Sequence, residues 1–239
     1  MGCLQGAKIR LIDHLKKLEY LRGLPSRDET FFARLKQLKA WQQQRLARTY
    51  RDLAADPRYA SAIEFFLEEL YGTGESALRD RDLIRMYPSI KRVMPAFAFE
   101  TVNKALELDV ISEEFDQALA RELGAVKITE ASYIVAFRSA GGEQARLHQV
   151  ALMRDVGRQL QRVVEKPFIY VTLRMLRSPA RVAGLSHMQQ FLERGFSAFR
   201  HMNGAEHFLQ TIASRETRLV ERIFAGHPAP FDMLDDLQG

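Results

Sequence analysis

The sequence predicts an all-α protein that folds as a single helical bundle of about ten helices. Apolar residues recur every three to four positions along nearly the whole chain, and no segment alternates between apolar and polar residues as a strand would. Prolines, glycines and helix-capping residues divide the chain into pieces of helical length. With 239 residues and 46% hydrophobic content, the chain can bury its own core without a metal or a disulfide.

Residues 1–55 are expected to form an N-terminal helical hairpin. A first helix over 5–22 and a long polar helix after it are separated by a Pro-Ser break. Residues 56–226 form the larger part and pack with this hairpin as one domain, because no linker long enough to separate two domains interrupts the chain. Residues 227–239 are acidic and are expected to be a flexible tail.

Capping residues divide residues 56–124 into four expected helices. Asp56 is a good N-cap and precedes Pro57, which suits the first helical position. Ser112 is also placed as an N-cap, with two glutamates in the turn behind it, where the helix dipole favours negative charge. The four helices are expected at about 57–71, 80–93, 95–111 and 113–124.

Five further helices are expected in residues 125–226. Thr129 is an N-cap, and Gly-Gly, Pro and Asn-Gly breaks follow at helix-length intervals. The segment 168–176, FIYVTLRML, has the β-branched and aromatic content of a strand, but no second strand is available to pair with it. It is therefore expected to be a buried helix. The five helices are expected at about 129–140, 143–166, 168–176, 178–202 and 205–225.

The chain carries a net charge of +5, and the excess is uneven. Residues 138–181 hold nine basic side chains against three acidic ones. On the helix over 143–166 the basic residues recur every four positions and predict a basic patch. Such a ridge can contact nucleic acid or an anionic membrane, but it lacks interleaved aromatic residues for base stacking, so a solvated face is favoured. The patch comprises Arg146, Arg154, Arg158, Arg162 and Lys166.

Cys3 is the only cysteine, so no disulfide within the chain and no cysteine-based zinc site is expected. The N-terminal residues lack an apolar run of signal-peptide length. The longest apolar stretch, 168–176, is far shorter than the roughly 20 residues that span a bilayer. A cytoplasmic location is therefore expected.

Residues 65–71 read FFLEELY, and this string resembles the defining motif of the bacterial FFLEELY-motif proteins. The resemblance covers about residues 55–225 and implies a helical, cytosolic protein; it supplies no reaction, ligand or catalytic residue. Further matches to the family pattern lie at 107–109, 178–181, 191–196 and the pair Arg215-Glu216.

One aromatic residue of this string lies away from the expected core face of its helix. At about 100° per residue, Phe65 points nearly opposite the core arc. Either the helix is buried on two sides, which is favoured in a bundle of many helices, or Phe65 is an exposed anchor for a partner. His187, Arg194 and His201 share a stripe on another helix and are expected to be solvated or to contact a neighbouring subunit of a homo-oligomer.

Several carboxylates fall on or near apolar helix faces. Asp109 and Glu216 lie within such faces, and Glu64 lies at the edge of one. Because an unpaired buried charge is costly, Asp109 and Glu216 are each expected to pair with an arginine across a helix interface; a ligand or metal site, which could include Glu64, is the alternative. His148 and Asp155 lie at the boundary of an apolar face, where they could line a pocket.

The leading functional prediction is a non-catalytic cytosolic protein that binds a partner protein, or an apolar or anionic ligand between helices. A metal- or haem-dependent helical enzyme is an alternative, because one histidine suffices as an axial haem ligand. No metal site or cofactor is predicted, since the Glu-x-x-His pairs of ferritin-like iron sites are missing from the sequence. Binding to nucleic acid or to an anionic membrane surface through the basic patch is the third hypothesis.

Overall fold

The computed structural model describes residues 2–23, 28–70, 78–79, 81–86 and 95–232. Every regular element in these ranges is helical, which confirms the predicted all-α class. The elements are α1 (Gly2–Gly23), α2 (Glu29–Thr49), α3 (Arg51–Ala55), α4 (Ala60–Phe65), the π-helical turn η2 (Phe66–Leu70), α6 (Ala96–Leu123), α7 (Glu130–Ser139), α8 (Glu143–Val164), α9 (Pro167–Met175), α10 (Arg177–Val182), α11 (Ser186–His201) and α12 (Glu206–Ala225).

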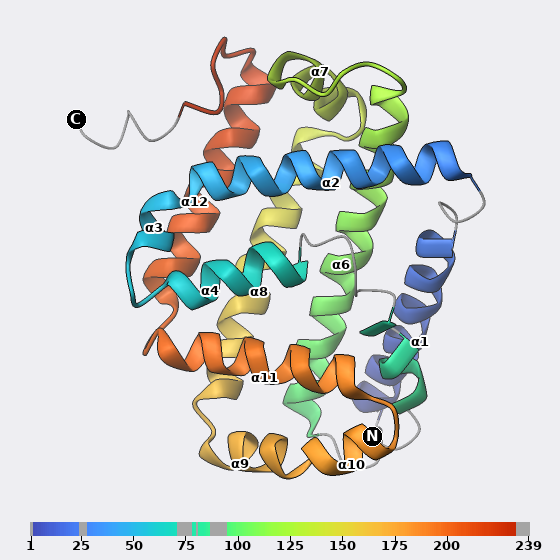
Figure 1. The fold of residues 1–239 in the computed structure, drawn as a ribbon, viewed down its shortest axis with the longest axis vertical. Coiled ribbons are helices and arrows are strands. Elements are labelled where there is room, and N and C mark those ends of the chain that lie inside the picture. The colour runs from blue at the N-terminus through green and yellow to red at the C-terminus, as the bar shows by residue number, and fades with distance from the viewer. Residues whose placement is uncertain (1, 24–27, 71–77, 80, 87–94, 233–239) are drawn as a thin grey trace.

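The long helices set the frame of the molecule (Figure 1). Helix α6 packs against both α1 and α8, and α8 packs in turn against α12. Helices α2 and α11 cross these long helices, with α4 packed on α11. Helix α7 lies at the upper end in this view, and α9 and α10 form the lower end. None of the helices in the described ranges has both the length and the apolar content to cross a membrane.

The core consists of three clusters of buried apolar side chains. One joins α2, α4, α11 and α12, the second joins α2, α6, α7 and α12, and the third joins α1 to α6. Gly157 lets α8 and α12 approach closely, because a Cβ atom there would lie 2.3 Å from a methyl carbon of Leu209. The expected N-terminal helices thus pack with the rest through shared clusters.

One of the predicted caps is confirmed, since Thr129 forms a capping box with Ser132. The predicted cap at Asp56 is wrong, because α4 begins at Ala60 and not at Pro57, and Tyr59 precedes it without a side-chain cap. Asp56 Oδ1 accepts a hydrogen bond of 2.8 Å from the Arg58 backbone N–H inside the turn over residues 57–59.

The predicted break at Ser112 is wrong, since α6 runs through it without interruption. The Ser112 hydroxyl donates to the Leu108 carbonyl at 2.8 Å and accepts from the Gln149 amide at 2.8 Å, so it does not compete for backbone N–H groups as a cap would. Conversely, two expected single helices are split. The chain bends at Tyr50 between α2 and α3, and Gly184, at φ +69°, lies between α10 and α11.

The segment 168–176 is helical as predicted, but it is not buried. Phe168 is 57% exposed, Val171 50% and Met175 72%. Its apolar residues were expected in the core, whereas the outer side of α9 has no described element packed over it. Three predictions fall wholly or mostly outside the described residues: the end of a helix at Tyr71, the helix over 80–93 and the acidic tail. Within the predicted helix over 80–93, residues 81–86 are described and are helical.

Candidate functional site

Glu216 is held by two groups from α2 and the bend that follows it. Its carboxylate accepts hydrogen bonds from Arg45 Nη1 at 2.6 Å, from Arg45 Nη2 at 3.1 Å and from the Tyr50 hydroxyl at 2.6 Å. Burial alone would lower the pKa of the Arg45 guanidinium, but Glu216 raises it above its ordinary value. This pair between α2 and α12 confirms the prediction that Glu216 binds an arginine across a helix interface.

Arg215, the neighbour of Glu216 on α12, forms an ion pair with a carboxylate of α3. It donates to both carboxylate oxygens of Asp52, at 2.8 and 2.6 Å, and to the Thr49 carbonyl at 2.9 Å. The hydrogen bond from Arg215 lowers the pKa of Asp52. Two adjacent residues of α12 therefore fix α2 and α3 through ion pairs of opposite polarity.

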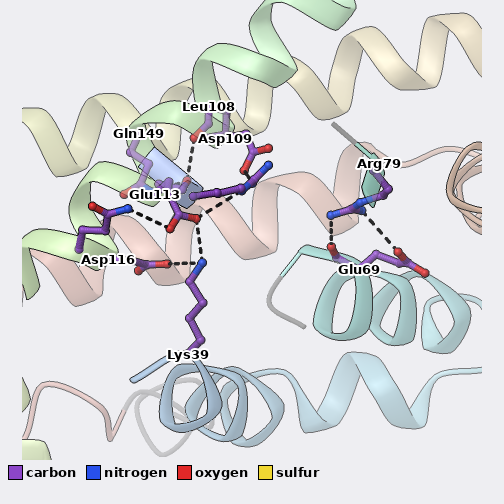
Figure 2. A network of polar contacts seen from close by, with 11 residues as sticks. Lys39, Glu69, Arg79, Leu108, Asp109, Glu113, Asp116 and Gln149 are labelled. Atoms are coloured by element: carbon purple, nitrogen blue, oxygen red, sulfur yellow. Dashed lines mark hydrogen bonds and ion pairs between the residues drawn. The ribbon is translucent and has the colours of Figure 1, made fainter. Parts of the chain in front are cut away.

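A row of carboxylates on α6 meets cations from α1 and α2 (Figure 2). Arg22 Nη2 lies 2.6 Å from Asp109 and Arg22 Nε lies 3.7 Å from Glu113. Lys39 Nζ lies 2.8 Å from Glu113 and 3.9 Å from Asp116. Asp109 was predicted to pair with arginine, whereas Glu113 and Asp116 were missed because a helix start was placed at Ser112.

The two carboxylates that share Lys39 have pKa shifts of opposite sign. Burial would raise the pKa of Glu113, but Lys39 and then Arg22 lower it overall. Burial raises the pKa of Asp116, and the nearby Lys39 does not offset this. Glu113 therefore favours the folded state above its unfolded pKa, and this stability is lost as pH falls through its lower folded pKa. The protonated Asp116 side chain favours the folded state below its unfolded pKa. That stability is lost as pH rises through the raised folded pKa.

We therefore expect E113Q and D116N to change the free energy of unfolding in opposite directions at pH 7. E113Q should lose about 1–3 kcal/mol, because its buried carboxylate makes a charge-assisted bond to Lys39, and the loss should disappear as the solution is acidified. D116N should gain up to about 1 kcal/mol at pH 7 and nothing in acid. Urea unfolding from about pH 3 to pH 7 measures both. Equal effects of one sign would contradict the assignment.

Phe65 packs in the interior and does not serve as an exposed anchor. It is 8% exposed, its ring centroid lies 5.3 Å from that of Phe191, and a Cβ atom on Gly195 would lie 2.9 Å from its Cζ. Its helix is thus buried on two sides, as favoured, and the prediction of a partner contact through Phe65 is wrong. The π-helical turn that follows at η2 also changes the spacing of side chains from that of a regular helix.

Two glutamates of η2 bind the same arginine of α11. Arg194 Nη2 lies 2.6 Å from Glu68, and Arg194 Nη1 lies 2.6 Å from Glu69. Arg79 donates to the Glu69 carbonyl at 2.9 Å (Figure 2). Its guanidinium lies 4.3 Å from the ring centroid of Phe191. Arg194 is therefore engaged within the chain, although it was expected to be solvated or to contact a subunit.

The other predicted site residues are dispersed. Glu64 and His148 are exposed, and Asp155 is half-buried. His187 Nδ1 lies 3.9 Å from Asp82 Oδ2, and His201 Nε2 lies 3.1 Å from the Pro57 carbonyl. Within the described residues, no group of three or more His, Cys, Asp or Glu residues could hold a metal ion. The candidate carboxylates Glu64, Asp109 and Glu216 do not converge on one pocket.

The predicted basic patch on α8 is not a continuous surface. Arg146 is only 5% exposed and its guanidinium lies 3.8 and 4.1 Å from the ring centroids of Phe115 and Phe137. Arg158 donates to both carboxylate oxygens of Glu206. Arg154 is half-buried, so only Arg162 and Lys166 are left as exposed members. Burial and an ion pair therefore interrupt the ridge that regular spacing suggested.

Large apolar side chains gather instead on α9 and α10. Leu176 is 45% exposed and Val182 is 86% exposed, in addition to the three exposed residues of α9. A hollow of about 330 Å³ lies beside Val171 and is lined by Tyr170, Arg174 and Met175. Arg174 and Arg181 are exposed beside these residues. We refer to Phe168, Val171, Met175, Leu176 and Val182 as the apolar end.

Comparisons with known proteins identify a family but no function. Neither a curated protein nor a solved structure matches the chain. A family model, described as a domain of unknown function (DUF8198), matches residues 24–230 and therefore includes the ion pairs of α2, α6 and α12, the η2 turn and the apolar end. The chain belongs to this family.

Proposed function

We propose that this protein acts by binding, without catalysis of its own, and that the apolar end is its binding surface. The observation that carries the proposal is the exposure of five large apolar side chains on two consecutive helices and on Leu176, which joins them. Soluble proteins rarely keep apolar patches of this kind unless something covers them, because each exposed apolar group costs free energy in water. The exposed arginines beside the patch favour a partner surface that is both apolar and negatively charged.

The paired carboxylates between helices have a structural role in this proposal. Each of Asp109, Glu113 and Glu216 has a cation within 2.8 Å, so none needs a metal or ligand to satisfy its charge. We therefore favour the surface over a ligand pocket between helices. We also propose that the protein is cytoplasmic and that it is a member of the FFLEELY-motif proteins.

Site-specific photocrosslinking tests this surface inside the cell. A photoreactive phenylalanine analogue is placed at Val182 in α10, and separately at Val135, which is 65% exposed on α7. These two valines are exposed on helices at opposite ends of the molecule (Figure 1). We expect one kind of adduct, lipid or protein, from position 182 and none from position 135. The adduct should disappear when V171N and M175Q are added.

The contradicting outcomes are equally specific. If positions 182 and 135 give the same adducts, the apolar end is not a specific surface. If position 182 gives no adduct in cells that contain the protein at its native level, the apolar end does not bind a partner, and the proposed function fails. Circular dichroism of each variant confirms that loss of an adduct does not come from unfolding.

A further inference from the structure

We infer that the apolar end docks on the surface of an anionic lipid bilayer, with α9 lying in the plane of the membrane. This inference rests on the proposed function, since it names the partner of the same surface. It does not involve the basic patch on α8, and it requires no membrane-spanning segment. The argument comes from the arrangement of apolar and basic residues on α9 and α10.

The exposed side of α9 is apolar. At about 100° per residue, Phe168, Val171 and Met175 fall within an arc of about 60°. In a solvated helix this exposed arc would be polar, whereas here it carries an aromatic ring, a valine and a methionine that are each at least half exposed. A helix with an outward apolar face and basic residues at its edges is typical of proteins that lie at the membrane interface.

The charge around the apolar end is mainly positive. Residues 166–192 contain four lysines or arginines and no aspartate or glutamate. One of the four, Arg177, binds Glu193, and Lys166 belongs to the basic patch. Arg174 and Arg181 are left as exposed cations on the same two helices as the apolar side chains. An anionic membrane attracts each such cation near its surface, while the apolar side chains insert between the lipid headgroups.

Other occupants fit these residues less well. A second copy of this chain would bring two sets of arginines into one interface, and like charges close together repel. A nucleic acid would use the arginines and could stack a base on Phe168, but the other four exposed side chains of the apolar end have no ring and would gain little from it. An acidic protein is the remaining alternative, and the experiments below distinguish it.

Vesicle flotation of the purified full-length protein tests the inference. The probes are vesicles of phosphatidylcholine with about 30% phosphatidylglycerol, and vesicles of phosphatidylcholine alone. We expect binding to the anionic vesicles and at least about tenfold weaker binding to the neutral ones. Binding should also weaken as NaCl rises from about 0.05 to 0.5 M, because salt screens the attraction of the arginines to the headgroups.

Two sets of variants separate the apolar and the basic contributions. V171N/M175Q removes apolar contacts without changing charge, and R174Q/R181Q removes charge without changing the apolar face. Each should lower the partition coefficient about tenfold or more. The control V135N alters a valine of similar exposure on α7 and should bind as the wild type does. If R174Q/R181Q abolishes binding while V171N/M175Q has no effect, the surface is only an electrostatic one, and the inference is wrong.

A fluorescent probe reports whether the apolar end enters the bilayer. In a C3S background, an environment-sensitive dye on V182C should become brighter and blue-shifted with anionic vesicles, whereas the same dye on V135C should not change. If wild-type protein ignores vesicles while photocrosslinking captures one protein at position 182, the membrane inference fails and the proposed binding function stands. If neither vesicles nor photocrosslinking gives a signal, both fail.

Discussion

Replacing Arg45 with methionine is expected to destabilise the fold by about 3–5 kcal/mol, one of the largest effects of any single substitution discussed here. Arg45 is 7% exposed, and its guanidinium supplies two of the three hydrogen bonds that Glu216 accepts. Methionine fills similar space but leaves a carboxylate with only the Tyr50 hydroxyl as a donor. Urea unfolding followed by circular dichroism measures the change.

The same helix offers a matched control. Arg48, three residues further along α2, pairs with Glu130, but both side chains are more than half exposed. R48M should therefore cost no more than about 1 kcal/mol. The double variant R45M/E216L should be more stable than R45M alone, because removal of both charges leaves no uncompensated carboxylate. If R45M costs no more than R48M, the pair does not fasten α2 to α12.

The sequence indicated which carboxylates need a partner but not which cation supplies it. Helical spacing placed Asp109 and Glu216 on apolar faces, and burial of charge then required an arginine. Their partners, Arg22 and Arg45, lie 87 and 171 residues away along the chain. Periodicity describes one helix at a time, so it carries no information about which of the many arginines faces a given carboxylate.

The errors in the sequence analysis also have physical causes. Serine at position 112 suits a helix cap, but its hydroxyl donates a hydrogen bond to the Leu108 carbonyl within a continuous helix. The residue type alone does not distinguish these two cases. The apolar residues of α9 have the same spacing whether a neighbouring helix or an external partner covers them. Only the three-dimensional arrangement shows that no described element lies over Phe168 and Met175.

F65A is expected to destabilise the fold by about 3–5 kcal/mol, because it removes a buried aromatic ring from the contact between α4 and α11. The ring lies against Phe191 on one side and over Gly195 on another. The matched control is F32A on α2, where the ring is 53% exposed and its loss should change stability by about 0.5 kcal/mol or less. Chemical unfolding of the two variants gives the comparison directly.

Substitution of the glycine tests the same contact from the opposite helix. Alanine usually stabilises a helix relative to glycine by about 1 kcal/mol. In G195A, however, the new methyl group would lie 2.9 Å from Phe65 Cζ, so the ring or the helix must shift, and we expect a net loss of about 1–2 kcal/mol. Adding F65L should recover part of it, since the shorter side chain leaves room for the methyl group. Two results together would contradict this packing: G195A is more stable than the wild type, and F65A is no less stable than F32A. Phe65 would then leave the interior in solution, and its interpretation as an exposed anchor would be correct.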